Sequence, residues 1–256
     1  MSRIASAFDH GKAFIAFLTC GDPDLETTAA AVRAAVRGGA DLIELGIPFS
    51  DPTAEGPVIQ EANLRALRGG ATTDRIFAFV EELRRDVRIP LVFMTYANVV
   101  FSYGAERFLD ACRRIGIDGL ILPDLPYEEK EEFGPLCRER EIDLISMIAP
   151  TSERRVAMIA REAEGFIYLV SSLGVTGTRD RITTDLTPVT RAIRENARVP
   201  FAIGFGISTP AQARAMADLS DGAIVGSAIV KILAEYGREA PPRIEEYVRS
   251  MKSALA

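Results

Sequence analysis

The chain has 256 residues, of which 48% are hydrophobic, and its formal net charge at pH 7 is −6. A negative net charge is atypical of surfaces that bind nucleic acids or anionic membranes, and no apolar run approaches the roughly 20 residues that span a bilayer. His10 is the single histidine, and Cys20, Cys112 and Cys137 lie far apart without CxxC spacing. This pattern argues against a histidine-based metal site, a Ser-His-Asp triad and a disulfide framework. Because the N-terminus also lacks a secretory signal, we expect a cytoplasmic protein.

Short apolar runs predict eight strands along the chain. They are residues 13–19, 42–46, 90–95, 119–122, 143–148, 166–170, 201–204 and 222–225. Helical periodicity or N-cap signals follow each run, at residues 25–37, 59–67, 73–85, 105–115, 127–139, 151–162, 188–195, 210–217, 227–234 and 242–255. Continuous apolar runs are typical of parallel strands that are buried on both faces. Eight strand-then-helix units without a linker predict a single-domain α/β fold, a (β/α)8 TIM barrel over residues 1–256 with extra short helices.

Two predicted loops, after the second and the sixth strand, are longer than the 2–6 residues that are usual for this architecture. Both follow a strand, so both are expected at the C-terminal mouth of the barrel, where such barrels carry their active sites. Loops of this kind are candidate lids.

Glu44 lies inside the second apolar run, where a carboxylate is costly to desolvate. Because side chains alternate along a strand, Ile43 and Leu45 are expected to pack under the helices, and Glu44 to point into the barrel. The carboxylate is either held structurally by backbone N–H groups or a cation, or it exchanges a proton at a raised pKa. Two more acids, Asp51 and Glu55, lie on the following loop, where capping, solvated and catalytic interpretations all stay open.

Glycines after the last strands suggest a phosphate site. Gly204 and Gly206 follow the seventh strand, and Gly226 and Ser227 follow the eighth at a predicted helix start. Barrels often bind phosphate between these two loops, where backbone N–H groups and a helix N-terminus face the anion. Gly177, on the long loop after the sixth strand, could add a further N–H.

Tyr168 and Tyr96 lie at strand ends and are either core residues or hydroxyls at the barrel mouth. Several apolar residues at strand ends could form core or wall a flat aromatic ligand. They are Phe17, Met94, Leu122, Ile148 and Phe205.

The motifs together resemble the tryptophan synthase α subunit family. The resemblance rests on ELGIPFSDPTAEGPVIQ at 44–60, YAN at 96–98, GVTG at 174–177, GFGIS at 204–208 and GSAIVK at 226–231. It implies retro-aldol cleavage of indole-3-glycerol phosphate to indole and glyceraldehyde 3-phosphate. It also implies that the indole passes to a β subunit, which holds the pyridoxal phosphate, in an αββα heterotetramer for tryptophan biosynthesis. No cofactor is implied in this chain.

Site roles follow from the resemblance position by position. Glu44 matches the principal acid-base that protonates indole C3, and Tyr168 matches a tyrosine that assists it. The phosphate grip is implied at Gly177, Gly204, Gly206, Gly226 and Ser227. The indole pocket is implied at Phe17, Met94 and Phe205. Thr176 matches the loop that closes over substrate, and Asp51 and Asn98 fall in segments that face the β subunit.

Glu55 departs from the family, which usually has Asp at this position as the second catalytic acid. That acid accepts the indole N–H hydrogen bond and stabilises positive charge on the ring. One added methylene moves the carboxylate further from the backbone, and a shift near 1 Å can cost about 10²-fold in rate. Three hypotheses follow: an active α subunit, a catalytically weakened chain that mainly activates the β subunit, and a stand-alone lyase that releases indole. Other phosphate-binding barrels fit the fold but leave residues 44–60 unexplained.

Overall fold

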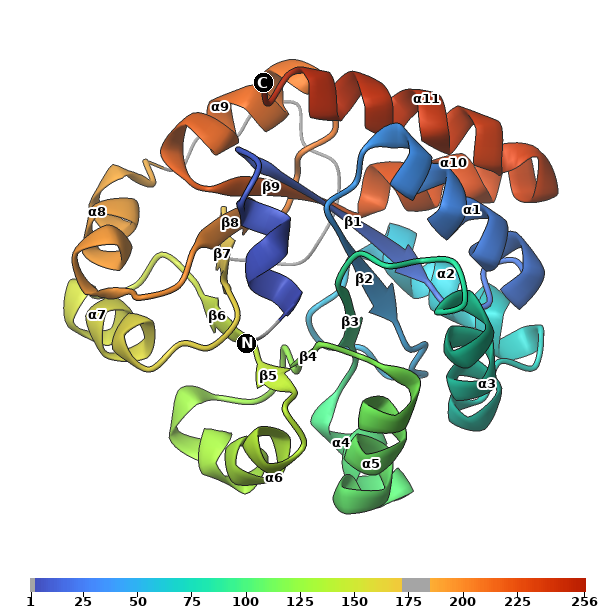
Figure 1. The fold of residues 1–256 in the computed structure, drawn as a ribbon, viewed down its shortest axis with the longest axis horizontal. Helices are drawn as coiled ribbons and strands as arrows, with labels where there is room; N and C mark the ends of the chain where they lie inside the picture. The colour runs from blue at the N-terminus through green and yellow to red at the C-terminus, as the bar shows by residue number, and fades with distance from the viewer. Residues whose placement is uncertain (1–2, 172–184) are drawn as a thin grey trace.

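The computed structural model describes residues 3–171 and 185–256, and this part of the chain forms a barrel of parallel strands ringed by helices (Figure 1). The strands are β1 (Ala13–Thr19), β2 (Leu42–Gly46), β3 (Leu91–Met94), β4 (Gly119–Ile121), β5 (Asp143–Leu144), β6 (Ser146–Ile148), β7 (Ile167–Val170), β8 (Phe201–Gly204) and β9 (Gly222–Val225). The sheet order is β5-β4-β3-β2-β1-β9-β8-β7-β6. The predicted (β/α)8 fold class is confirmed.

The fifth predicted strand is divided, because its two halves pair with different neighbours. β5 pairs with β4, whereas β6 pairs with β7. Ile145 lies between them, and its N–H still donates to the carbonyl of Leu120 at 2.9 Å. The chain itself therefore closes the barrel at this point, and the nine assigned strands among the described residues correspond to eight strand positions.

Helices surround the barrel and mostly follow the predicted bounds. They are α1 (Leu25–Gly38), α2 (Pro57–Arg68), α3 (Thr73–Leu83), α4 (Ala97–Tyr103), α5 (Ala105–Ile115), α6 (Gly134–Glu139), α7 (Glu153–Arg161), α8 (Thr187–Asn196), α9 (Pro210–Leu219), α10 (Ser227–Tyr236) and α11 (Ala240–Ser253). Three 3₁₀ helices accompany them, η1 (Arg3–Phe8), η2 (Tyr127–Glu132) and η3 (Gly237–Glu239). The expected helix at 127–139 is wrong in detail, since it is η2 followed by the short α6, and α4 and η1 were not expected.

Local signals explain where helices begin and end. Asp24 caps α1, because its carboxylate accepts from the Thr27 N–H at 2.7 Å, and Gly39 ends the helix with φ of 102°. At α9, Thr209 and Gln212 form a capping box, and Pro210 occupies the first helical turn. These caps fix the entry of each helix relative to the strand before it.

Strand alternation divides the interior into two cores. Ile43 and Leu45 belong to the outer core between barrel and helices, whereas Leu42 belongs to the inner core inside the barrel. Glu44, with the same parity as Leu42, is buried at 1% exposure. The predicted orientation of Glu44 is therefore confirmed by its strand neighbours.

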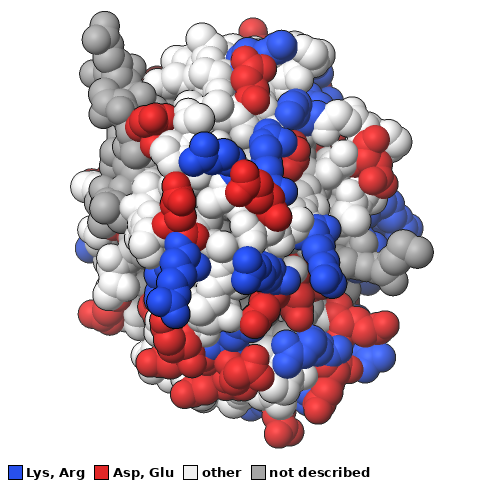
Figure 2. Space-filling view, turned by 90° about the vertical axis from the view of Figure 1, so that its left-hand side faces the viewer, with Lys and Arg blue, Asp and Glu red and all other residues white. Residues whose placement is uncertain are grey.

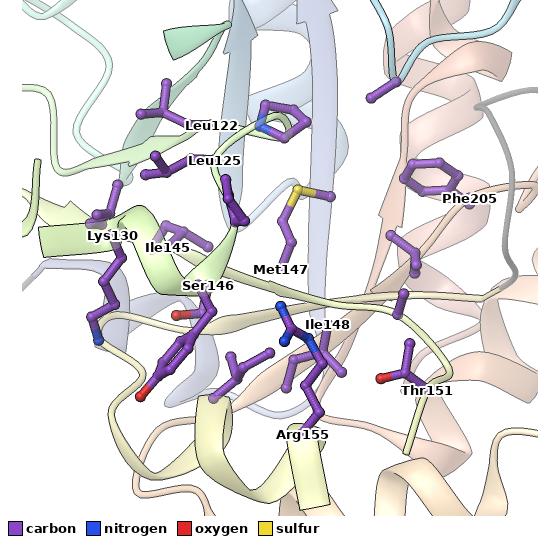
Figure 3. Close-up of a pocket in the computed structure, with 18 residues that line it drawn as sticks. Leu122, Leu125, Lys130, Ile145, Ser146, Met147, Ile148, Thr151, Arg155 and Phe205 are labelled. Atoms are coloured by element: carbon purple, nitrogen blue, oxygen red, sulfur yellow. The ribbon is translucent and has the colours of Figure 1, made fainter. Parts of the chain in front are cut away.

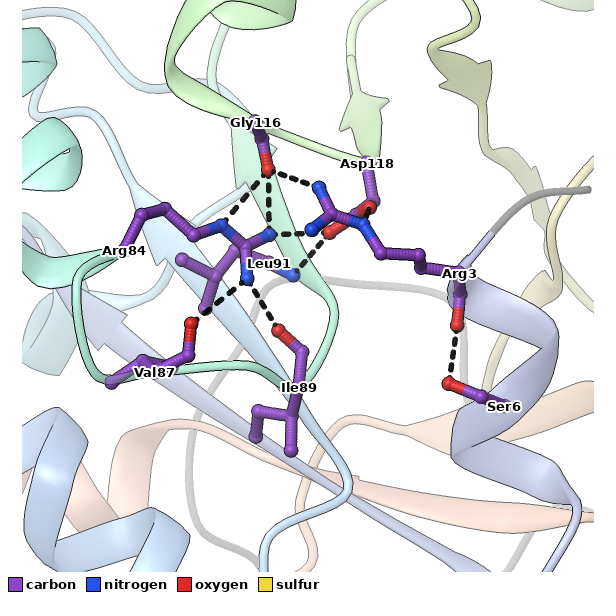
Figure 4. Close-up of polar contacts among 8 residues, drawn as sticks. All are labelled: Arg3, Ser6, Arg84, Val87, Ile89, Leu91, Gly116 and Asp118. Carbon is purple, nitrogen blue, oxygen red and sulfur yellow. Dashed lines mark hydrogen bonds and ion pairs between the residues drawn. The ribbon is translucent and has the colours of Figure 1, made fainter.

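The N-terminal end of the barrel is closed by η1, which lies across it in Figure 1. Arg3 and Arg84 both bind the Asp118 carboxylate, at 2.6 and 2.5 Å, and both donate to the carbonyl of Gly116 (Figure 4). The same carboxylate accepts from the Leu91 N–H at 2.9 Å. This network joins η1 to the starts of β3 and β4, at the opposite end from the loop that carries Glu55.

Acidic and basic side chains are interspersed over the side of the barrel where α7 and α8 lie (Figure 2). Pairs such as Arg191 with Glu153 and Arg155 with Glu128 neutralise one another there. No stripe of one sign, of the kind that tracks a nucleic-acid backbone, crosses the described residues on this side. In the same described ranges no helix is both long enough and apolar enough to cross a bilayer.

Candidate active site

Glu44 is the third residue of β2, and neither of its carboxylate oxygens has a hydrogen-bond partner among the described residues. Its strand neighbours are Phe17 on β1 and Val92 on β3. Burial without a partner disfavours the charged form and raises the pKa of Glu44 to about 8. The carboxyl is therefore mostly protonated at neutral pH. The structural interpretation, a carboxylate held by backbone N–H groups, finds no support among those residues.

Glu55 lies near the end of the loop between β2 and α2 and is buried, with 9% exposure. Asn63 Nδ2, on α2, donates to Glu55 Oε2 at 2.7 Å. Burial raises the pKa of Glu55 to about 7, against the lowering effect of hydrogen bonds from Asn63 and Tyr96. The Tyr96 hydroxyl also accepts from the Ala54 N–H at 3.1 Å, which ties the loop to the end of β3.

Asn63 was missed by sequence reasoning. It is buried at 4% exposure on the face of α2 that also carries Ile59, one turn earlier. A polar residue on the buried face of an amphipathic helix, two turns after an acid at the helix start, was the available signal.

One pocket brings both acids together at the barrel mouth. Glu44 and Glu55 line it with all three residues predicted for the indole pocket. Its apolar wall consists of Phe17, Ala54, Ile59, Met94, Pro123, Met147, Phe205, Ile207 and Ile224. Two carboxyl groups with raised pKa values in one apolar pocket are an arrangement suited to moving a proton near neutral pH.

Tyr168 lines the same pocket from β7, and its exposure is 5%. Burial, together with the negative charge of Glu44, raises the pKa of Tyr168 well above its usual range, so the hydroxyl stays protonated. Its ring contacts Phe205 edge to face, with centroids 6.0 Å apart. A methyl group at Gly204 would lie 2.5 Å from the Tyr168 hydroxyl, so this glycine makes room for the tyrosine.

Only some of the residues predicted to bind phosphate line the pocket. Gly206, Gly226 and Ser227 line the pocket, and Ser227 begins the ten-residue helix α10. The N-terminus of this helix therefore opens at the pocket, which favours an anion. Gly204 does not line it, and Gly177 lies outside the described residues. Phe205 and Gly206 both have left-handed backbone, with φ of 75° and 85°.

Two further predicted residues, Asp51 and Asn98, do not line the pocket. Asp51, on the loop after β2, and Asn98, on α4, are both exposed. Thr176 falls outside the described residues. Within 3–171 and 185–256 no group of three or more His, Cys, Asp or Glu side chains is arranged to hold a metal ion.

Comparisons with known proteins identify the family. A family model described as tryptophan synthase alpha chain matches residues 5–256. The tryptophan synthase alpha chain of Lacticaseibacillus casei is 47% identical, with 100% of this chain and 96% of that protein covered. The Lactiplantibacillus plantarum alpha chain is 49% identical, with 100% and 97% covered.

Solved structures agree with this result. A chain of Mycobacterium tuberculosis tryptophan synthase superposes with a TM-score of 0.90 at 33% identity, covering 99% of this chain and 98% of that one. A chain of the tryptophan synthase complex of Pyrococcus furiosus gives a TM-score of 0.84 at 35% identity, with 95% and 98% covered. Since sequence and fold match over nearly the whole length, the chain belongs to the tryptophan synthase alpha chain family.

Proposed function

We propose that this chain cleaves indole-3-glycerol phosphate into indole and glyceraldehyde 3-phosphate, with Glu44 and Glu55 as its two catalytic acids. The chain is a carbon–carbon lyase of tryptophan biosynthesis, as its family membership indicates. The observation that carries the residue assignment is the buried, unpartnered carboxyl of Glu44, whose pKa of about 8 keeps it protonated at pH 7.

Protonated Glu44 donates its proton to C3 of the indole ring, which makes the ring an electron acceptor. The bond between C3 and the glycerol carbon then breaks, and its electron pair returns to the ring and restores indole. The hydroxyl on that carbon loses its proton to the Glu44 carboxylate and becomes the aldehyde, so the acid is regenerated. Glu55, as a carboxylate, accepts the ring N–H and stabilises the positive charge that forms after C3 is protonated.

Other pocket residues hold the substrate in this proposal. Phe17, Met94 and Phe205 wall the indole ring, and the Tyr168 hydroxyl assists Glu44 in positioning C3. The phosphate is bound by the backbone at Gly206 and Gly226, by Ser227 and by the N-terminus of α10, which is supported by their place on the pocket. Gly204 acts indirectly by seating Tyr168. Gly177 and Thr176, from the loop after β7, complete the site.

The chain functions with a tryptophan synthase β subunit, in an αββα assembly. The similarity to a chain of the Pyrococcus furiosus tryptophan synthase complex supports this partner. We assign Asp51 and Asn98 to the contact, because both side chains are exposed on segments that follow β2 and β3, next to the pocket. In this proposal the β subunit carries the pyridoxal phosphate, and the reaction takes place in the cytoplasm.

The test of the assignment is a Glu44→Gln variant, which keeps the shape of the side chain and removes its acid. We expect release of indole from indole-3-glycerol phosphate to be abolished, while the circular dichroism spectrum and inorganic phosphate binding stay as in the wild type. Turnover at a wild-type rate in a folded variant would contradict the role of Glu44.

A second candidate function is that the chain is a weak catalyst and acts mainly by activating the β subunit. Only one feature favours it, namely that Glu55 is one methylene longer than the Asp usual in the family. Rates of wild type and Glu55→Asp, measured with and without β subunit, separate the two. We expect the aspartate to change indole release by less than about tenfold, because Asn63 already fixes the Glu55 carboxylate in the pocket. A gain of orders of magnitude would instead support the weakened catalyst. High turnover by wild type without partner would identify a stand-alone lyase.

A further inference from the structure

A second cavity adjoins the catalytic pocket, between η2 and α7 (Figure 3). Its volume is about 380 Å³, whereas the pocket between Glu44 and Glu55 has about 40 Å³. Ligand pockets usually measure roughly 300–1,000 Å³. The second cavity therefore has room for a small organic molecule in the conformation described.

Ser146 contributes a small polar side chain to the wall of this space. It lies on β6 between Leu144 and Ile148, and all three line the cavity. Leu144 and Ile148 fill the outer core, but the serine side chain is too small to do the same. A larger side chain at this position would occupy part of the space. The gap coincides with the break at Ile145, where the strand changes its pairing partner.

Four residues line both the cavity and the catalytic pocket, so the two spaces are neighbours. They are Ala54, Pro123, Met147 and Phe205. Figure 3 shows Met147 and Phe205 projecting toward the space from opposite sides. Met147 is an unbranched, flexible side chain, which suits a movable partition. These shared side chains therefore form the boundary between the catalytic pocket and the cavity.

The cations at the cavity are already neutralised. Lys130 Nζ lies 3.1 Å from a Glu162 oxygen, and Arg155 binds Glu128 through two hydrogen bonds of 2.5 and 2.9 Å. The other lining residues are mostly apolar, among them Leu122, Leu125, Ile148, Ile159 and Val170. This environment suits a neutral, largely apolar molecule and does not suit a phosphate.

We propose that this cavity is a second binding site for indole, the neutral product of the cleavage reaction. Indole matches the cavity because it is a flat apolar ring system with one N–H donor, and Ser146 Oγ is an acceptor within the apolar wall. The phosphate-bearing substrate is excluded by the paired charges. The proposal rests on the proposed function, which names indole as the product.

Titration calorimetry with indole tests the site while the catalytic pocket is occupied. The Glu44→Gln variant is saturated with indole-3-glycerol phosphate, which it does not cleave, and indole is then added. We expect one further equivalent of indole to bind. Adding Ser146→Phe, which fills the cavity, is expected to weaken this binding at least about tenfold.

Ser146→Leu is the second variant, in case phenylalanine overpacks the site, and thermal unfolding of each variant checks the fold. Met158→Phe is the matched control, since Met158 is exposed on α7 and does not line the cavity. If the proposal holds, Ser146→Leu also weakens binding of the further indole when it is combined with Glu44→Gln. Absence of the further equivalent, or binding that persists in both folded Ser146 variants, overturns it.

Failure of this inference is distinct from failure of the proposed function. In an otherwise wild-type chain, Ser146→Phe is expected to cleave indole-3-glycerol phosphate with kcat/KM unchanged within about twofold, because Ser146 lies outside the catalytic pocket. A chain that cleaves substrate but binds no second indole refutes the cavity alone. A chain that releases no indole refutes the proposed function, and the difference in indole binding between wild type and Ser146→Phe then reports on the cavity.

Discussion

We expect the hydrogen bond from Asn63 to Glu55 to set the acidic limit of the pH range in which the proposed site is active. The proposed mechanism requires Glu44 protonated and Glu55 ionised, and their pKa values of about 8 and about 7 leave a narrow pH window between them. Asn63→Leu replaces the amide by an apolar side chain of similar size. The Glu55 carboxylate then loses its 2.7 Å donor, so its pKa rises.

The size of this effect follows from the bond that is lost. A hydrogen bond to a charged group contributes about 1.5–3 kcal/mol, and one pKa unit corresponds to about 1.36 kcal/mol. The pKa of Glu55 is thus expected to rise from about 7 by about one to two units. At pH 7 the ionised fraction falls from about a half to between about a tenth and a hundredth, and kcat/KM falls about 5- to 50-fold.

The assay is the pH profile of kcat/KM for indole release between about pH 6 and 9.5. We expect the acidic limb to move up to about pH 8 and the maximal kcat/KM to fall, because the pKa of Glu55 then reaches or passes that of Glu44, which is about 8. Gln60→Leu is the control, because Gln60 Nε2 donates to the backbone carbonyl of Glu55, at 2.7 Å, and not to its carboxylate. An acidic limb that stays in place in Asn63→Leu, at full activity, would refute the reasoning.

Three further predictions concern stability. Folding raises the pKa of Glu44 from 4.5 to about 8, so the wild type loses stability as pH rises through this range. In urea unfolding, Glu44→Gln should therefore gain unfolding free energy relative to wild type, by about 3 kcal/mol at pH 7 and by little below pH 4.5. Gly204→Ala places a methyl group against the Tyr168 hydroxyl and should lower the unfolding free energy by about 1–3 kcal/mol in thermal melts, together with activity; an unchanged midpoint would contradict this close contact. Arg84→Ala removes one partner of the buried Asp118 carboxylate and should lower the free energy of unfolding in urea by about 3–5 kcal/mol. The kcat/KM of the folded fraction should stay unchanged, because the pair lies at the end of the barrel that η1 closes.

Much of the fold could be predicted because local and global signals agree. Continuous apolar strands, caps such as Asp24 and stops such as Gly39 each mark an element without knowledge of its neighbours. Strand parity was enough to point Glu44 into the barrel, since alternation is a property of every strand. Glu44 and Glu55 were expected near each other because Glu44 lies on β2 and Glu55 on the loop that follows it.

Other features depend on contacts that no single segment contains. The break at Ile145 arises because β5 and β6 pair with different neighbours, and sequence shows only one continuous apolar run there. Sequence alone marks Ser146 only as a polar residue in that run, and its place on the wall of a cavity depends on where η2 and α7 lie in the fold. The role of Gly204 likewise depends on Tyr168 across the β7–β8 pair.

The longer side chain of Glu55 reaches a hydrogen-bond donor on α2. A shorter acid at this position reaches less far from the loop, whereas Glu55 extends to the amide of Asn63, which α2 holds two turns into the helix. Because α2 begins at Pro57, immediately after the capping Gly56, the acid and its donor are joined by one rigid element. The longer side chain is therefore fixed in position, and the penalty expected for a displaced carboxylate is reduced. The same contact opposes the rise in pKa that burial causes, so a longer acid in an apolar pocket still ionises near neutral pH.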